Sequence, residues 1–233
     1  MKKGKKVIVI TGGNSGLGKA TAEILAGENN VVILGKNVTE VERISKELKC
    51  DGIICDITDE KQVQKSFSQI IEKYKKVDCL INCAGVWIKG PIEQNSPKEI
   101  RNTILVNTMG TMLTINALVP QFKKQKYGRI INVISQAGLN AKAERSVYNA
   151  SKWAVTGFTK CIQLELAPFN ISVVGFYPGF IHTGLFGKAE DARTDFSTAM
   201  PVEKPAKALV YLVNVDDDLV INSFEMQLLQ KAK

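Results

Sequence analysis

The sequence lacks the features that mark a disulfide framework, a zinc site or a membrane segment. Its 233 residues contain five cysteines, an odd number with no Cys-x-x-Cys pair, which argues against both a disulfide framework and a zinc site. No apolar run approaches the ~20 residues needed to cross a bilayer, and the apolar segment 7–10 is far too short for a signal peptide. We therefore expect a cytoplasmic protein that binds no metal ion and enters no membrane.

The positive charge of the chain lacks the arrangement that nucleic-acid binding requires. The net charge is +8 and the isoelectric point about 9.2, a balance that by itself suggests nucleic acid or an anionic membrane surface. The lysines are scattered, apart from the short segment 2–6, and no aromatic residues are interleaved with basic ones. We therefore expect no nucleic acid as a partner and interpret segment 2–6 as a solubility feature.

Apolar runs and helical patterns alternate along the chain. With 45% hydrophobic residues, a chain of this length can bury one large core, and no internal repeat or long linker divides it. The alternation predicts a single α/β domain, 1–233, with a Rossmann-like doubly wound parallel sheet and helices on both faces. The irregular segment 184–201 is predicted to form a mobile lid over the carboxyl ends of the strands. The predicted strands are 7–10, 31–34, 52–55, 77–82, 129–134 and 171–177, and the predicted helices are 20–25, 59–74, 97–122 and 147–166.

A glycine-rich turn joins the first strand to the first helix. The strand 7–10 is followed by Thr-Gly-Gly-Asn-Ser-Gly-Leu-Gly at 11–18 and then by a helical pattern. Glycines let the backbone approach a pyrophosphate, and the free amides of a helix N-terminus favour its negative charge. A tight turn with glycines at positive φ is the simpler interpretation. The strand before and the helix after favour the phosphate-binding half of a dinucleotide fold.

The end of the second strand is where such folds select between the two nicotinamide cofactors. An acidic side chain there would bind the ribose hydroxyls and repel a 2′-phosphate, and this chain has none. Gly35 leaves room and Lys36 brings positive charge, which predicts a preference for NADP(H) over NAD(H). Alternatively, Lys36 is a solvated surface lysine.

A tyrosine and a lysine four positions apart form the most informative polar pair. On a helix, Tyr148 and Lys152 share one face, so the ammonium group can favour the ionised phenol and make the tyrosine usable as an acid or base. Such a spacing alone is weak, because tyrosine and lysine often share an exposed helix face. Ser135, thirteen positions upstream at a strand end, strengthens the pattern.

Together these motifs resemble those of the short-chain dehydrogenase/reductases, in their classical subdivision, over essentially the whole chain. The elements occur in the order and spacing of that family. They are Thr-Gly-Gly-x-x-Gly-x-Gly at 11–18, Asp56 after the third strand, Asn-Cys-Ala-Gly at 82–85, Asn107, Ser135, Tyr-x-x-x-Lys at 148–152 and Pro-Gly-x-x-x-Thr at 178–183.

The resemblance implies a catalytic set. Tyr148 would donate a proton to a substrate carbonyl oxygen or accept it in the reverse direction, and Lys152 would lower the Tyr148 pKa and hold the nicotinamide ribose. Ser135 would hydrogen-bond the same carbonyl oxygen, although a serine that caps a strand end is the simpler interpretation. Asn107 would lie at a helix kink with a water relay to the lysine, or would be a buried, satisfied asparagine.

The resemblance also implies cofactor contacts. Asp56 has an ordinary alternative as a residue at a helix N-terminus. We interpret His182, the only histidine, as a titrating bystander. The implied contacts are Gly12, Asn14, Ser15, Gly16, Leu17 and Gly18 at the pyrophosphate and ribose, Lys36 at the 2′-phosphate, Asp56 and Ile57 at the adenine, Asn82, Ala84 and Gly85 along the central strand, Pro178 and Gly179 after the sixth strand, Ile181 and Thr183 at the carboxamide, and Tyr148 and Lys152 themselves.

The partners implied are a small-molecule carbonyl or alcohol substrate and a second copy of the chain. A helical apolar stripe is consistent with a homodimer surface but equally with internal core, and a tetramer stays open because the chain ends without the Asp-Gly-Gly segment of many members. The stripe is Ala154, Phe158, Ile162 and Leu166, and the predicted substrate wall is Trp87, Gln136, Leu139, Phe180, Leu185 and Phe186.

These observations predict an NADP(H)-dependent oxidoreductase that reduces a ketone or aldehyde to an alcohol, reversibly. One alternative is a catalytically silent NAD(P)-binding regulator on the same fold, although the complete set of Ser135, Tyr148 and Lys152 argues against it. A scaffold that exploits the basic surface is a third class, and it predicts salt-sensitive binding.

Overall fold

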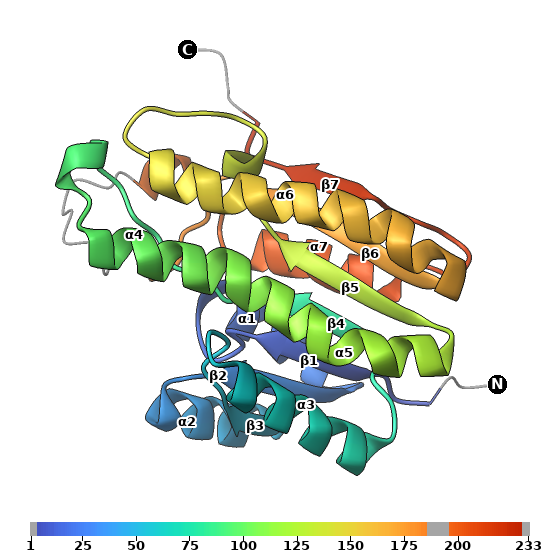
Figure 1. Ribbon diagram of the computed structural model, residues 1–233. Coiled ribbons are helices and arrows are strands. Elements are labelled where there is room, and N and C mark those ends of the chain that lie inside the picture. The colour runs from blue at the N-terminus through green and yellow to red at the C-terminus, as the bar shows by residue number, and fades with distance from the viewer. Residues whose placement is uncertain (1–3, 186–195, 230–233) are drawn as a thin grey trace.

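The computed structural model describes residues 4–185 and 196–229, and within them seven strands form one parallel sheet (Figure 1). Every neighbouring pair in the order β3-β2-β1-β4-β5-β6-β7 is parallel. This order confirms the predicted doubly wound sheet and places a topological switch point between β1 and β4, where open α/β sheets bind ligands. The strands are β1 (Val7–Thr11), β2 (Asn30–Gly35), β3 (Asp51–Ile54), β4 (Cys79–Asn82), β5 (Gly128–Val133), β6 (Ile171–Pro178) and β7 (Ser223–Met226).

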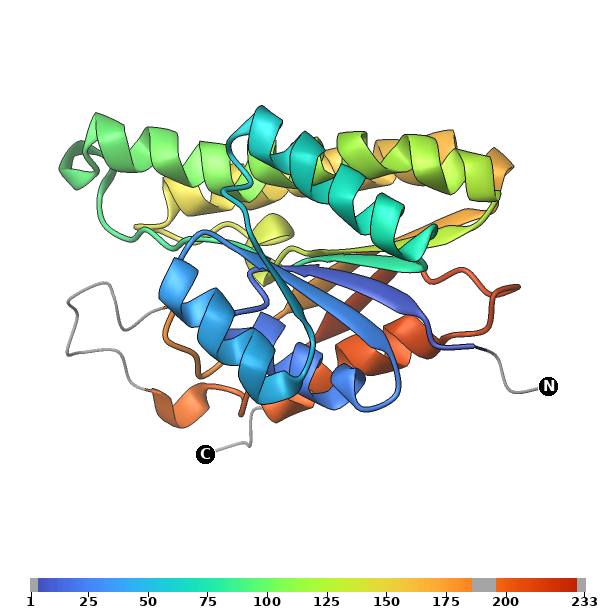
Figure 2. The ribbon, with the colours of Figure 1, turned by 90° about the horizontal axis from the view of Figure 1, so that it is seen from below.

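Helices cover both faces of the sheet (Figure 2). Ile8 and Ile10 of β1 lie in the core beneath α1, α2 and α7, whereas Val7 and Val9 lie in the core beneath α3, α5 and α6. Because successive side chains of a strand point to opposite faces, a strand covered on both sides is apolar throughout, as the run at 7–10 indicated. The helices are α1 (Gly16–Ala26), α2 (Val38–Leu48), α3 (Glu60–Tyr74), α4 (Pro97–Ile104), α5 (Thr111–Gln125), α6 (Ser146–Leu166) and α7 (Glu203–Asn214).

Three elements of the fold are absent from the sequence prediction. Only Val41 and Ile44 of α2 are fully buried, so its apolar pattern is sparse. Helix α7 carries Pro205 in its first turn, where proline is tolerated but reads as a break. Strand β7 is a four-residue edge strand with alternating exposed and half-buried residues, and such a short segment resembles a loop in sequence.

The predicted helix 97–122 is present, but it is not uniform. Ser96 and Glu99 form a capping box at its start, and the chain runs through α4, a π-helical segment (Leu105–Gly110) and α5. Among the described residues, Pro97–Gln125 is the one helix long and apolar enough to cross a membrane, with half of its apolar window buried. Leu118 and Phe122 are fully buried against the sheet, as in the core helix of a globular domain.

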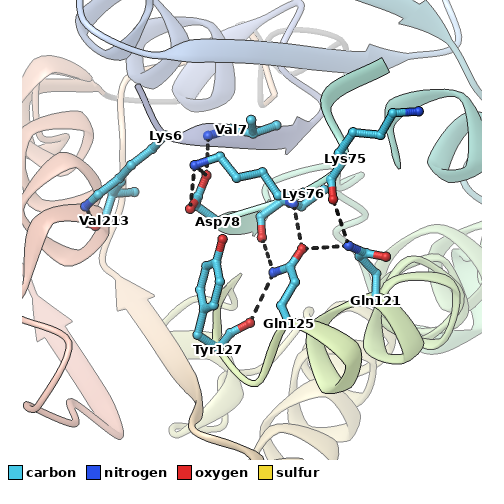
Figure 3. A network of polar contacts seen from close by, with 10 residues as sticks. Lys6, Val7, Lys75, Lys76, Asp78, Gln121, Gln125, Tyr127 and Val213 are labelled. Carbon is cyan, nitrogen blue, oxygen red and sulfur yellow. Dashed lines mark hydrogen bonds and ion pairs between the residues drawn. The ribbon is translucent and has the colours of Figure 1, made fainter. Parts of the chain in front are cut away.

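A polar network ties β1, β4 and α5 together at the amino ends of the strands (Figure 3). The Asp78 Oδ2 accepts the Val7 N–H at 2.6 Å and pairs with Lys76 Nζ at 3.0 Å. The Gln125 side chain accepts the Val77 N–H at 3.0 Å and donates to the Val77 carbonyl at 2.8 Å. These bonds hold the amino edge of the sheet, opposite to the edge where the predicted site residues lie.

The predicted lid, 184–201, falls in part on residues 186–195, which lie outside the described residues. The described remainder is attached to the segment after β6, because Met200 donates its N–H to the Phe180 carbonyl at 2.8 Å and accepts from the His182 N–H at 2.9 Å. The Phe196 ring stacks on the rings of Phe180 and His182, with centroids 5.5 and 4.4 Å away. The lid itself stays a prediction.

Candidate active site

The predicted site residues gather at the carboxyl edge of the sheet. The glycine-rich turn follows β1, Lys36 follows β2, Asp56 follows β3, and Ser135 follows β5. Parallel strands bring all their carboxyl ends to one edge, so residues far apart in sequence meet there.

The turn between β1 and α1 has the geometry of an anion site. Gly12 has φ 66° and Gly16 has φ 52°, conformations that side chains other than glycine rarely adopt. The N-cap residue Ser15 makes no side-chain capping bond, and the first turn of α1 carries no acidic residue. The amides at this helix start are therefore available to an anion. Leu17 is buried in the core, which limits its contribution to backbone groups.

Residues from the segments after β4 and after β6 approach this turn. A methyl group added at Gly12 would lie 2.8 Å from Ala84 Cα, and one at Gly16 would lie 3.6 Å from Thr183 Cβ. A methyl group at Gly85 would lie 3.3 Å from Asn107 Oδ1 and 3.8 Å from Lys152 Nζ. The fold thus brings the glycine turn, the exit of β4 and the polar helix residues into one region.

The space beside Gly35, which we expected to be open, is filled by the side chain of Asn14. A methyl group at position 35 would lie 2.3 Å from Asn14 Oδ1, so the glycine accommodates an amide side chain of the turn. The prediction that Gly35 leaves room for the cofactor is therefore wrong, because the absent side chain makes room for Asn14. Lys36 is exposed and forms no ion pair with any described residue. Its charge remains available at this edge.

The side chains of Asp56 and Asn82 are engaged by the protein itself. Asp56 Oδ1 accepts from the backbone N–H and the hydroxyl of Thr58, whereas the N-cap of α3 is Asp59. The Asn82 amide donates to Asn132 Oδ1 at 2.9 Å and accepts from Thr114 Oγ1 at 2.8 Å. Asn82 therefore joins β4, β5 and α5, which leaves its backbone as the group that can face a ligand.

Ser135 occupies a strained backbone position. Its φ of 142° lies in the region that favours glycine, and such conformations cost on the order of 1–3 kcal/mol and concentrate at functional sites. Its Oγ accepts the Ala137 N–H at 3.1 Å, and it is also in hydrogen-bonding contact with the Tyr148 hydroxyl. Ser135 caps a short 3₁₀ helix (Gln136–Gly138) and adjoins the tyrosine, and its contact with a substrate carbonyl stays a prediction.

Tyr148 and Lys152 lie side by side in α6, as their spacing predicts. The Lys152 Nζ is 5.8 Å from the centroid of the Tyr148 ring and donates to the Val133 carbonyl at 3.2 Å. Their side chains are almost completely buried, with 5% and 6% of the residue surface exposed. A chance pair on a solvated helix face would be exposed, so the burial removes that alternative.

Burial controls the pKa values of this pair. It raises the pKa of Tyr148 to about 12, against the opposing effects of the hydrogen-bonding contact with Ser135 and of the positive charge of Arg145. It also lowers the pKa of Lys152 to about 8, because a charged ammonium group loses hydration in this environment. The prediction that Lys152 lowers the Tyr148 pKa is therefore wrong for this structure, in which desolvation dominates.

Asn107 lies in the π-helical segment, an irregularity of the helix at the position where a kink was expected. Its Oδ1 accepts the Val86 N–H at 2.8 Å, and its amide donates to the Val86 carbonyl and to Ser151 Oγ, both at 3.0 Å. The side chain is buried and fully bonded, which is the second interpretation offered by the sequence. Asn107 thus fastens the segment after β4 to α6, beside Lys152.

Trp87 and Arg145 frame Tyr148, and only Trp87 was expected there. The rings of Trp87 and Tyr148 meet edge to face with centroids 4.5 Å apart, and the Arg145 guanidinium carbon lies 5.0 Å from the Trp87 centroid. The sequence analysis missed Arg145, although its position three residues before Tyr148 places it one helical turn away.

The other residues of the predicted substrate wall do not all lie together. Gln136 donates to Gln227 Oε1 at 3.0 Å, and Leu139 packs in a small core cluster with Ile134 and Val155. Leu185 is exposed, and Phe186 lies outside the described residues. Phe180 contacts Phe196, as described above.

The lowered Lys152 pKa predicts a pH-dependent stability. Between about pH 8 and 10.5 the unfolded lysine holds a proton that the folded one has lost, so wild-type stability rises with pH in that window. At pH 7 the variant Lys152→Met should therefore have a free energy of unfolding about 3 kcal/mol higher than that of the wild type, and this difference should nearly vanish by about pH 10.5.

Urea unfolding of both proteins at several pH values measures this difference. Lys160→Met removes an exposed lysine from the same helix and should show no such trend. A difference that stays constant from pH 7 to pH 10.5 would contradict the lowered pKa.

The residues present fit a nicotinamide dinucleotide. The two positive-φ glycines and the uncapped start of α1 suit a pyrophosphate, and Thr183 adjoins Gly16 at the point where the second half of such a molecule would continue. Lys152, and with it Tyr148, lies next to Gly85 at the same edge of the sheet.

Comparisons with known proteins agree with this geometry. Residues 6–194 match the sequence profile described as short chain dehydrogenase. An uncharacterized oxidoreductase of Listeria monocytogenes is 32% identical over 234 aligned residues, which cover 94% of each chain. The crystal structure of a 3-ketoacyl-(acyl-carrier-protein) reductase from Brucella melitensis complexed with NADH is 26% identical with a TM-score of 0.87 and covers 96% of this chain and 97% of its own. An alcohol dehydrogenase from Thermococcus sibiricus complexed with 5-hydroxy-NADP shares the fold at 23% identity, with a TM-score of 0.88 and coverage of 98% and 99%.

Proposed function

Because the chain belongs to the short-chain dehydrogenase family, an NAD(P)-dependent oxidoreductase family, we propose that it reduces a ketone or aldehyde to an alcohol with NADPH, reversibly. The observation that carries the proposal is the buried pair of Tyr148 and Lys152 beside Ser135, at the carboxyl edge of the sheet. A buried phenol and ammonium group without a chemical task would be costly to retain.

In the proposed reaction Tyr148 acts as the general acid. A nicotinamide held at this edge would supply the hydride for reduction and would accept it in the reverse direction. The Tyr148 hydroxyl donates its proton to the carbonyl oxygen, which becomes the alcohol oxygen. With a pKa of about 12 the phenol is protonated at neutral pH, the form required for reduction. The Ser135 hydroxyl donates a hydrogen bond to the same oxygen and stabilises the charge that develops there.

Lys152 and Asn107 support this acid in different ways. With a pKa near 8, Lys152 exchanges protons close to neutral pH, and we propose that it supplies the proton by which Tyr148 is restored and holds the ribose hydroxyls of the cofactor. Asn107 is a positioning residue, because its side chain fixes Val86 and Ser151 around the lysine. The proposed path therefore uses Lys152 for proton exchange and Asn107 for its placement.

The cofactor contacts proposed for this chain follow the edge of the sheet. Backbone amides at 16–18 would bind the pyrophosphate, and Thr183 would bind near the carboxamide. Ile57 is buried against Gly110 of the π-helical segment, and we propose that Asp56 and Ile57 border the adenine. The segments 82–85 and 178–181, at the exits of β4 and β6, would line the rest.

The preference for NADP(H) rests on Lys36. Lys36→Asp should lower the ratio of kcat/KM for NADPH to that for NADH by about 10- to 100-fold, because a carboxylate replaces the cation that would pair with the 2′-phosphate. Steady-state kinetics with both cofactors measure the ratio.

The matched control is Lys46→Asp, the same charge change at an exposed position of α2. It should leave the ratio within about twofold, since exposed charges at a distance are screened by salt. An unchanged ratio in Lys36→Asp would contradict the assignment.

A homodimer in the cytoplasm remains part of the proposal. Ile162 and Leu166 of the predicted apolar stripe are buried in the monomer core, so that stripe is mainly internal. Exposed apolar side chains remain on the same layer, at Leu105 and Met109 of the π-helical segment and at Trp153 of α6, and they support a face that a second copy would cover. The element contacts place the π-helical segment against α6.

A further inference from the structure

We propose that Arg145 binds an anionic group of the substrate, a carboxylate or a phosphate, so that the substrate is an oxo acid or a phosphorylated carbonyl compound. The inference rests on the proposed reductase function and concerns what the same site selects.

The position of Arg145 directs its charge at the reacting centre. It is the N-cap residue of α6 and precedes Tyr148 by one helical turn. Its guanidinium carbon lies 5.0 Å from the Trp87 ring centroid, and that ring meets the Tyr148 ring at 4.5 Å. The Arg145 charge also lowers the pKa of Tyr148, although burial has the larger, opposite effect. Arg145, Trp87 and Tyr148 therefore form one wall.

The guanidinium group has unused hydrogen-bond donors. In the part of the chain that the structure describes, Arg145 donates no hydrogen bond and forms no ion pair, and its one partner is the face of Trp87. By contrast, Arg43 pairs with Glu40 and Glu47, and Arg129 donates to carbonyl oxygens at the end of α7. Stacking on an aromatic face leaves the N–H edge of an arginine free, and that edge fits a carboxylate or phosphate through two parallel bonds.

The start of α6 adds to the positive potential around Arg145. The helix is 21 residues long, has no side-chain cap and carries no acidic residue in its first turn. Its positive end therefore faces the same region. The loop before it is held by the Gly90 N–H, which donates to the Glu144 carbonyl at 2.8 Å. The nearest charged side chains along the chain, Lys142 and Glu144, are exposed.

Matched ligand pairs distinguish the contribution of the anionic group to binding from that of the carbonyl group. With saturating oxidised cofactor to prevent reduction, calorimetry would give the dissociation constants of 4-oxopentanoate, 5-oxohexanoate and 6-oxoheptanoate and of their methyl esters. Dihydroxyacetone phosphate and dihydroxyacetone form the phosphate arm. In the wild type, at least one anion should bind about tenfold or more tightly than its neutral partner, because a charged bond of this kind is lost with the neutral ligand.

The variant Arg145→Met should lower this ratio by roughly 10- to 100-fold, and Arg145→Lys should retain part of it. Lys142→Met removes one charge from the same loop and should leave the ratio unchanged. The inference is overturned if no anion is preferred, or if Arg145→Met and Lys142→Met change the ratio equally. Turnover assays with reduced cofactor test the reductase function separately from the role of Arg145. An anion preference without any turnover would overturn the reductase function, whereas turnover without anion preference would overturn the role of Arg145.

Discussion

Replacing Tyr148 by phenylalanine is expected to lower kcat for carbonyl reduction by about a thousandfold, because positioned general acids contribute typically 10² to 10⁴ in rate. The phenyl ring keeps the edge-to-face contact with Trp87 and loses only the hydroxyl that meets Ser135. Folding should therefore be preserved. Oxidation of NADPH, followed by its absorbance across a panel of ketones and aldehydes, measures the loss.

Cofactor binding provides the control for this variant. The affinity for NADPH, measured by calorimetry, should fall by less than about tenfold in Tyr148→Phe, since one hydrogen bond contributes about 0.5–1.5 kcal/mol. Wild-type turnover that persists in the variant would refute the role of Tyr148. A protein that binds the cofactor but turns over no member of the panel, with or without the hydroxyl, would instead agree with a silent regulator on the same fold.

Replacing Gly18 by alanine is expected to lower the free energy of unfolding by about 3 kcal/mol, at the upper end of the cost of overpacking a core. The added methyl group would lie 2.4 Å from the Gly12 carbonyl oxygen and 3.1 Å from Gly13 Cα. These are backbone atoms, which cannot rotate away as a side chain can. To accommodate the methyl group, α1 must move away from the glycine turn, so the affinity for the cofactor pyrophosphate should fall as well.

Gly27→Ala is the matched control for this prediction. Gly27 follows α1 with φ −62°, and no atom lies within 4 Å of an added methyl group. That variant should be neutral or slightly more stable, because alanine restricts the unfolded chain. Urea unfolding and calorimetric titration with NADPH measure both effects. Equal stability of Gly18→Ala and Gly27→Ala would show that the close approach of turn and helix is not required.

Much of the fold was predictable because its signals are local. The period of apolar residues predicted six of the seven strands to within two residues at either end and indicated four helices, since each element must bury a continuous face. The fit was poorest where that face is small, at α2 with two buried residues and at the edge strand β7.

The pairing of Tyr148 with Lys152 was also predictable for a local reason. Tyr148 and Lys152 are four positions apart, so the helix alone brings them to one face, whatever surrounds them. The glycine turn at 12–18 followed in the same way, because only glycine takes the backbone angles that Gly12 and Gly16 adopt there without strain.

The tertiary structure alone decided which side chains are free to react. In sequence, the side chains of Asn82 and Asn107 look available to a ligand, yet the protein itself engages both. Asn82 is hydrogen-bonded to Asn132 and Thr114, and Asn107 is hydrogen-bonded to Val86 and Ser151. These partners lie far away along the chain, and no local pattern encodes them.

The electrostatic state of the site was likewise decided by the tertiary structure. The contact of Arg145 with Trp87, and the burial that raises the pKa of Tyr148 to about 12 and lowers that of Lys152 to about 8, arise only when the segment after β4 packs on α6. Sequence therefore determined the chain's family, fold and candidate acid, because short-range geometry fixes them. Folding determined how those groups ionise and what they can bind, because desolvation and long-range contacts depend on every neighbour at once.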